Sequence, residues 1–136
     1  MREYNKRPDD ELAVITKSKK LCLYVLSVTD KSPKKFRFTL ISRLQGYSLD
    51  IVEYLYRAND IVIGKNNTQS EQNERLAYQK KAMSTIRLLE YISEIAMLSN
   101  CILPKQFEQI SAMAFEVKRM LYGWMKSDYI RKNKNQ

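Results

Sequence analysis

The sequence of 136 residues contains no histidine. Histidine is the commonest general base and metal ligand in proteins, so its absence excludes Ser-His and Cys-His catalytic pairs. The only cysteines, Cys22 and Cys101, lie far apart in the chain and form neither a disulfide framework nor a zinc-ligand set. We therefore expect a protein that is not an enzyme and that uses no cofactor and no metal.

Glycine and proline are scarce, with three of each, which argues against the turn-rich architecture of a β-sandwich or barrel. No apolar run approaches the roughly 20 residues that span a bilayer, and no secretory signal precedes the first amphipathic stretch. These absences predict a cytoplasmic protein that does not bind membranes. The hydrophobic content of 44% is enough for the core of one domain.

Positive charge is in excess, with 24 Lys and Arg against 15 Asp and Glu, for a net charge of +9. The excess lies in residues 1–43 and 105–136, whereas residues 44–104 are nearly neutral. Two basic ends around a neutral middle favour a polyanion, such as a nucleic acid, as the partner.

Apolar residues recur at steps of three and four, which predicts amphipathic helices. Ser32-Pro33 has the pattern of a helix cap followed by proline at the first helical position, and Thr68 with Glu71 has the spacing of a capping box. Pro104 opens the last stretch. The expected helices are residues 9–30, 33–60, 69–99 and 104–128.

Four long helices with short connections predict an all-α fold, an antiparallel up-down-up-down four-helix bundle. The bundle is expected over residues 9–128. Residues 1–8 are expected to be a disordered N-terminal segment, and residues 129–136 a basic disordered tail.

The second and fourth predicted helices carry more apolar residues than one stripe needs. A helix that is apolar on two faces needs two neighbours, so we expect the protein to form oligomers. The additional apolar residues are Phe38, Ile41, Leu49, Val52 and Tyr56 in the second helix, and Met113, Met120 and Tyr122 in the fourth.

Several motifs, taken in order over about residues 17–127, resemble the accessory variability determinant proteins of bacterial diversity-generating retroelements. These belong to a four-helix-bundle group that also includes proteins encoded in intervening sequences of ribosomal RNA genes. Two of this chain's residues, Lys118 and Tyr122, stand where that family usually has glycine. The motifs are the segment 32–37, Arg43-Leu44, Leu49-Asp50-Ile51, Ala58-Asn59, Arg75-Leu76, the segment 86–89, the segment 105–108 and the segment 116–127.

The resemblance implies a non-enzymatic, barrel-shaped homopentamer. Its partners would be the retroelement's reverse transcriptase and the template-repeat RNA, and its role would be to support mutagenic cDNA synthesis. Two alternatives stay open: a ribosomal-RNA intervening-sequence type of four-helix-bundle protein of undefined role, and a basic protein–protein interaction module.

Lys34, Lys35 and Arg37 fall within one turn at the start of the second predicted helix, with Lys31 just before them. Lysine and arginine suit phosphate contacts, and the helix dipole makes cations unfavourable at this position unless an anion binds. These four residues are the main candidates for contact with RNA or with an acidic partner.

Three further basic residues are candidates for the same contact: Lys17, Lys20 and Arg43. Lys17 and Lys20 share one face of the first predicted helix and could extend the patch, because neighbouring helices lie side by side, while Lys19 points elsewhere. Arg43 and Arg87 sit among apolar neighbours. We expect Arg87 to be structural or at an interface, paired across the bundle with an acidic residue; the candidates are Asp50, Glu53 and Glu90.

Trp124 falls in the apolar series of the last helix, so we expect it to pack in the core or at an interface, with Tyr122 nearby. Stacking of these aromatics on bases is the alternative. The carboxylates Asp50, Glu53, Glu90 and Glu94 do not have the Glu-x-x-His pattern of a di-metal bundle site, so no metal is expected there.

Overall fold

The computed structural model describes residues 10–64 and 66–134. Four α-helices form the body of the molecule, and no strand occurs within those residues. The helices are α1 (Asp10–Asp30), α2 (Ser42–Asp60), α3 (Gln69–Leu98) and α4 (Pro104–Lys134). The predicted all-helical, four-helix fold is confirmed. The predicted N-terminal segment 1–8 lies outside the described residues.

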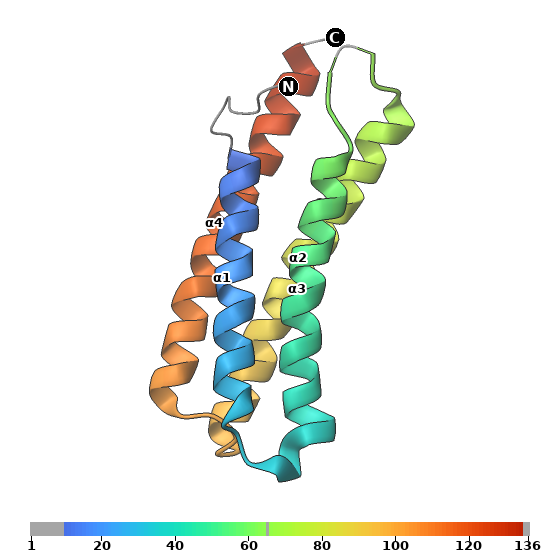
Figure 1. The fold of residues 1–136 in the computed structure, drawn as a ribbon. Helices are drawn as coiled ribbons and strands as arrows, with labels where there is room; N and C mark the ends of the chain where they lie inside the picture. The colour runs from blue at the N-terminus through green and yellow to red at the C-terminus, as the bar shows by residue number, and fades with distance from the viewer. Residues whose placement is uncertain (1–9, 65, 135–136) are drawn as a thin grey trace, which may run out of the picture.

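The helices pack side by side, with α1 against α2 and α4, and α3 against α2 and α4. Figure 1 shows the α1–α2 and α3–α4 connections at the lower end of the bundle and the α2–α3 connection at the upper end. We call these the lower and upper ends. Apolar side chains from all four helices fill the space between them, and most are fully buried. They include Val14, Leu21, Val25, Leu44, Ile51, Leu55, Ile86, Leu89, Ile110, Val117, Leu121 and Trp124.

The start of α3 is a capping box, as the sequence predicts. The Glu71 backbone N–H donates to the Thr68 hydroxyl at 3.0 Å, and the Thr68 N–H donates to the Glu71 carboxylate at 2.9 Å. These bonds satisfy backbone donors that have no partner within the helix. The hydrogen bonds from the backbone of Thr68 and the amide of Asn67 lower the pKa of Glu71.

The end of α3 is a Schellman motif. Asn100 takes a positive φ of 64°, the Cys101 N–H donates to the Ala96 carbonyl at 2.8 Å, and the Asn100 N–H donates to the Met97 carbonyl at 3.1 Å. The chain then turns directly into α4. Cys101 and Cys22 are both buried, and burial raises the pKa of the Cys101 thiol.

The start of the second predicted helix is irregular, and here the sequence prediction is wrong in detail. Ser32 does not cap the helix: its hydroxyl donates back to the Val28 carbonyl at the end of α1. Pro33 stands outside the helix with ψ of 136°, and its carbonyl accepts from the Phe36 N–H. A 3₁₀ turn, η1 (Lys34–Phe36), and a π-helical turn, η2 (Arg37–Ile41), then precede α2.

The π-helical turn changes which residues face the core. A π turn holds more residues than an α turn, so the apolar series drawn at α-helical spacing shifts across it. Ile41 is one of the additional apolar residues that we expected outside the core, but it is 8% exposed, whereas Phe38 of the same set is 86% exposed. Leu49 and Tyr56 of that set are exposed, as predicted.

The predicted disordered tail is wrong for residues 129–134, because α4 continues to Lys134. No proline or glycine follows Asp128 to end the helix, and the side chains of Asp128, Tyr129 and Lys132 face α3 around a small cavity. Residues 135–136 lie outside the described part of the chain. None of the helices described is both long and apolar enough to cross a bilayer.

Candidate nucleic-acid interface

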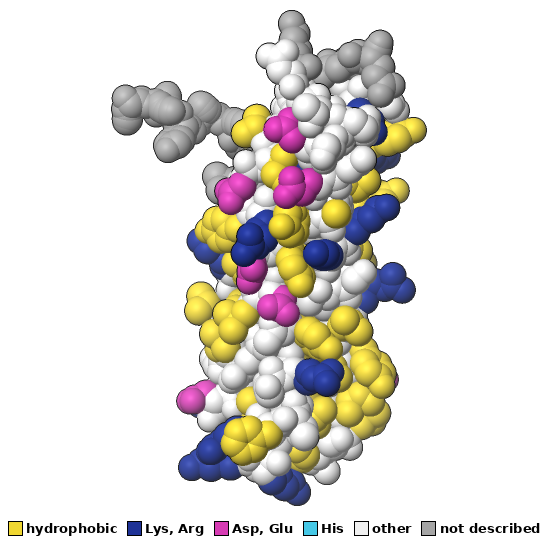
Figure 2. Space-filling view, turned by 90° about the vertical axis from the view of Figure 1, so that its right-hand side faces the viewer, with side chains coloured by type: hydrophobic (Ala, Val, Ile, Leu, Met, Phe, Trp, Pro, Cys, Tyr) yellow, Lys and Arg dark blue, Asp and Glu magenta, His cyan; other side chains and the backbone are white. Residues whose placement is uncertain are grey.

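Four of the predicted binding residues gather at the lower end of the bundle. Lys31 follows α1, Lys34 and Lys35 lie in η1, and Arg37 begins η2; all four are exposed. Among the described residues, none of the four forms an ion pair. Figure 2 shows basic and hydrophobic side chains side by side at this end of the α2–α3 face. We call these four residues the basic cluster.

Two phenylalanines alternate with these cations and point in opposite directions. Phe36 packs against the core, with the Lys35 ammonium 5.2 Å from its ring centroid. Phe38 points to solvent, with the Arg37 guanidinium 5.9 Å from its ring. The first aromatic therefore anchors the segment, and the second presents its ring beside the cluster.

Lys34, Arg37 and Phe38 line one open hollow of about 620 Å³ between the end of α1 and the start of α2. The rest of the lining consists of polar side chains, Gly46 and two apolar side chains, Ile41 and Leu49. One bond ties its two sides, because the Gln45 amide donates to the Thr29 hydroxyl at 2.9 Å. The other lining residues are Asp30, Ser32, Ile41, Ser42, Gly46 and Leu49.

The expectation that Lys17 and Lys20 extend this cluster is wrong. Both are exposed on α1, but more than two turns from its end, so about 15 Å or more separates them from the lower end. Their neighbour Lys19 lies 5.4 Å from the ring of Tyr56, which is close to the upper end of α2. Helices that run past each other place the middle of α1 beside the later turns of α2, not beside η1.

Arg43 lies one turn beyond the basic cluster on the exposed side of α2. Its guanidinium donates to the Tyr47 hydroxyl at 3.2 Å, a bond within the same helix. Arg43 does not line the hollow with Lys34 and Arg37. The structure therefore brings together Lys31, Lys34, Lys35 and Arg37, and leaves Arg43 at the edge.

Arg87 is exposed and forms no ion pair with Asp50, Glu53 or Glu90 within the described residues, so the expected pairing inside the bundle is wrong, while a role at an interface stays a prediction. Glu90, one of its proposed partners, accepts instead from the Lys118 ammonium at 3.0 Å across the α3–α4 contact. Glu53, another proposed partner, forms an ion pair with Arg57 within α2. Lys118 on α4 thus reaches across to a neighbouring helix.

The buried arginine is Arg75, near the upper end of the bundle. Its side chain is 4% exposed, and its guanidinium donates to both carboxylate oxygens of Asp128 at 2.8 and 2.9 Å. It also donates to the Ile61 carbonyl at 2.7 Å, and the Gln79 amide donates to Asp128 at 2.9 Å. This group, which we call the upper clasp, joins the end of α2 to α3 and α4. Sequence reasoning missed it, because 53 residues separate Arg75 from Asp128 and no local pattern links them.

Trp124 packs in the core next to the upper clasp, which confirms the prediction of core packing. The residue is 1% exposed, and the Arg75 guanidinium lies 4.9 Å from its ring centroid. Its indole N–H is buried, with no acceptor among the described residues. Stacking of Trp124 on a base would require the bundle to open. Tyr122, in contrast, is exposed on the outside of α4.

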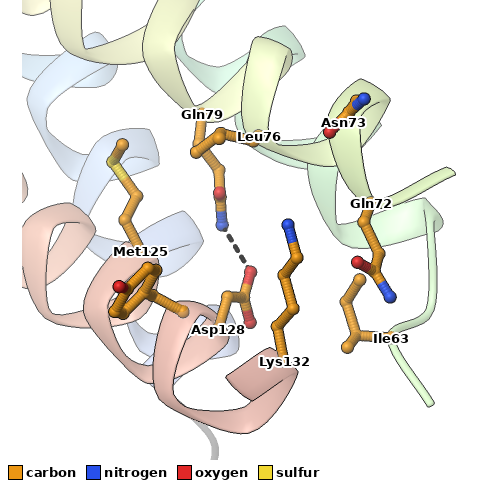
Figure 3. A pocket seen from close by; sticks show the side chains of 9 residues that line it. Ile63, Gln72, Asn73, Leu76, Gln79, Met125, Asp128 and Lys132 are labelled. Carbon is orange, nitrogen blue, oxygen red and sulfur yellow. Dashed lines mark hydrogen bonds between the residues drawn. The ribbon is translucent and has the colours of Figure 1, made fainter. Parts of the chain in front are cut away.

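Asp128 and Gln79 also line a cavity of about 110 Å³ between α3 and α4. Figure 3 shows the Lys132 side chain extending past Asp128 toward α3, with Met125 on the other side. The walls are mainly apolar, and two of the polar side chains, Gln79 and Asp128, are hydrogen-bonded to each other. The cavity lies where the last turns of α4 pack against α3.

A second exposed surface is apolar. On α3, Leu88, Tyr91 and Leu98 recur at the spacing of one helix face and are 44%, 59% and 67% exposed. Figure 2 shows hydrophobic side chains gathered over the lower half of the α3 side. On α4, Phe115 and Tyr122 are exposed in the same way. The chain thus carries two different surfaces, one basic and one apolar.

No group of three or more acidic or cysteine side chains in the described ranges is arranged to hold a metal ion. Comparison with protein-family models and with curated proteins found no match for this chain. The interpretation of both surfaces therefore rests on the residues themselves.

Proposed function

We propose that this chain is a non-enzymatic RNA-binding accessory protein that acts as a homo-oligomer. The observation that carries the proposal is the basic cluster. Its four exposed cations have no ion-pair partner within residues 10–64 and 66–134, and they stand beside an exposed aromatic ring. The partners implied by the family resemblance are a retroelement reverse transcriptase and its template RNA, and the proposal adopts them.

Charge complementarity supports RNA as the partner. Like charges held close together repel, and a polyanion relieves that repulsion while releasing its own counterions. Lysine supplies point charges, and arginine can donate to two phosphate oxygens at once. Elsewhere on the surface several cations are paired, as in Arg57–Glu53 and Arg119–Glu116, so their charge is locally cancelled.

The exposed apolar face of α3 supports self-association. Leucine and tyrosine side chains in such number on one helix face are typical of a contact surface. Connections at alternate ends of the bundle support the antiparallel up-down-up-down arrangement that the sequence predicts. We propose that α3 packs against another copy, and that the assembly is the barrel-like pentamer the resemblance implies. Light scattering at micromolar concentration should then report a mass several times 16.1 kDa.

The salt dependence of RNA binding tests the function. Each phosphate contact contributes to the slope of log affinity against log salt concentration. Replacing Lys34, Lys35 and Arg37 together by Gln should flatten that slope by about two to three units per engaged subunit. Circular dichroism and light scattering should report an unchanged helical content and mass.

A matched control removes three exposed cations from other parts of the surface. Lys80, Lys126 and Arg131, replaced by Gln, give the same net charge as the first variant. This control should retain nearly the wild-type slope. Equal slopes for both variants and the wild type would contradict a basic cluster that binds RNA.

A further inference from the structure

Phe38 is the most exposed large hydrophobic residue in the described part of the chain. A single exposed apolar side chain needs no special explanation by itself. Here, however, the ring stands beside Arg37 and forms part of the same hollow as Lys34. The hollow therefore joins an aromatic surface to two cations that have no ion-pair partner among the described residues.

The chemistry of the hollow matches the parts of a nucleotide. A base needs a flat apolar surface, phosphates need cations, and sugar hydroxyls need small polar groups. The hollow offers all three: the ring of Phe38 for the base, Lys34 and Arg37 for the phosphates, and the Ser42 hydroxyl for the sugar. The volume of about 620 Å³ lies within the usual range of small-ligand sites.

Gly46 is an independent observation that points to the same hollow. It lies inside α2, where glycine is a poor helix former, and its φ is not positive. A Cβ atom built on Gly46 would meet nothing within 4 Å, so no neighbouring group requires glycine there. Because Gly46 lines the hollow, its missing side chain keeps that space open.

We propose that the hollow holds one unstacked base of single-stranded RNA, with the base on the ring of Phe38 and the adjoining phosphates on Lys34 and Arg37. This inference rests on the proposed RNA-binding function and specifies the form of RNA. Bases of a duplex stay stacked inside the helix and cannot reach Phe38, so the protein prefers single strands. The recognition tolerates any sequence, because every base has a π face.

Asp30 also lines the hollow and restricts where a phosphate can bind in it. Its carboxylate repels an approaching phosphate, so the phosphates lie toward Lys34 and Arg37. Replacing Asp30 by Asn should strengthen binding of single-stranded RNA and leave its salt slope nearly unchanged. Weaker binding of that variant would contradict this placement.

The test compares Phe38→Ala with Tyr129→Ala, using a 12-nucleotide oligouridine, the same oligomer with abasic sites, and a blunt-ended RNA duplex. Tyr129 is also an exposed aromatic residue, at 66%, but lies near the upper end of α4. Loss of one base–aromatic stack should weaken oligouridine binding by Phe38→Ala about 5- to 100-fold without changing the salt slope. The Tyr129 variant should bind as the wild type does, and the abasic oligomer should not distinguish Phe38→Ala from the wild type.

Gly46→Leu is a second variant: its side chain should fill the hollow, and all basic residues are retained. It should weaken oligouridine binding to a similar degree, with helical content retained. Wild-type affinity of both Phe38→Ala and Gly46→Leu would overturn the stacking site. Equal losses of oligouridine and duplex binding would overturn it too, since a base stack predicts a loss for single strands only.

The two proposals fail in different ways. A flattened salt slope for the Gln triple variant, with wild-type affinity of Phe38→Ala, would leave the RNA-binding function standing and reject the base site. A wild-type slope for the triple variant would reject the function itself.

Discussion

The two ends of the bundle use arginine in opposite ways. At the upper end Arg75 is buried, donates to Asp128 and to the Ile61 carbonyl, and lies 4.9 Å from the ring centroid of Trp124. At the lower end Arg37 is exposed, has no carboxylate partner among the described residues, and faces an open hollow. A cation with its partners supplied by the chain contributes to the fold, whereas a cation left without them is available to an anion from outside.

The two ends also differ in backbone conformation. The upper end is closed by the regular capping box of Thr68 and Glu71. The lower end contains a 3₁₀ turn followed by a π-helical turn, and such π turns occur frequently at functional sites. Regular capping therefore accompanies the end where Arg75 is paired, and irregular backbone accompanies the basic cluster, which forms no ion pair in the part of the chain that the structure describes.

The largest expected effect comes from breaking the upper clasp. Asp128→Ala leaves the buried Arg75 without its carboxylate, and removing one partner of a buried ion pair costs about 3 kcal/mol. Chemical denaturation should report this loss of unfolding free energy. RNA affinity should stay at the wild-type value at temperatures where the variant is folded.

The matched control is Glu53→Ala, which breaks the exposed ion pair with Arg57, both side chains being 54% exposed. Exposed pairs contribute little, so its denaturation midpoint should stay close to that of the wild type. Equal effects of the two substitutions would contradict the distinction between a buried clasp and a surface pair.

Trp124→Phe gives a smaller effect at the same end. The substitution removes an indole N–H that lacks an acceptor, which favours folding, and leaves a small void, which opposes it. We expect a net loss of about 1 kcal/mol. Trp124→Ala, which removes the whole ring beneath Arg75, should cost at least twice as much, and denaturation of both variants measures the ratio.

The smallest effect is a dependence on pH at the start of α3. Hydrogen bonds from Thr68 and Asn67 lower the pKa of Glu71 in the folded protein. A carboxylate with a lowered folded pKa stabilises the fold above its unfolded pKa, and this contribution is lost as pH falls through the folded pKa. The melting temperature should therefore fall on acidification below about pH 4.5, and Glu71→Gln should make that fall shallower. Parallel curves for the variant and the wild type would contradict the role of Glu71.

Features that depend on neighbours in the sequence were predictable. Apolar spacing predicts all four helices, and the Thr68–Glu71 pair fixes the start of α3 because a capping box is a local motif. The candidate site was partly predictable for the same reason, since Lys31, Lys34, Lys35 and Arg37 are close in the chain.

Features that depend on distant residues were not predictable. Nothing in the sequence indicates that Asp128 pairs with Arg75, or that Glu90 pairs with Lys118 and not with Arg87. Only the packed bundle brings these helices together. The π-helical turn that buries Ile41 also escapes a reading based on α-helical spacing. Asp128 lies at the predicted boundary of a tail that is in fact part of α4.

The central claim is that the lower end, and not the upper end, contacts RNA. Lysine acetylation with mass spectrometry measures this directly on the unmodified protein, with and without the oligouridine. The account predicts that RNA protects Lys31, Lys34 and Lys35, while Lys80 and Lys126, also exposed, react at the same rate in both samples. Equal protection of all five lysines, or protection of Lys80 and Lys126 alone, would contradict it.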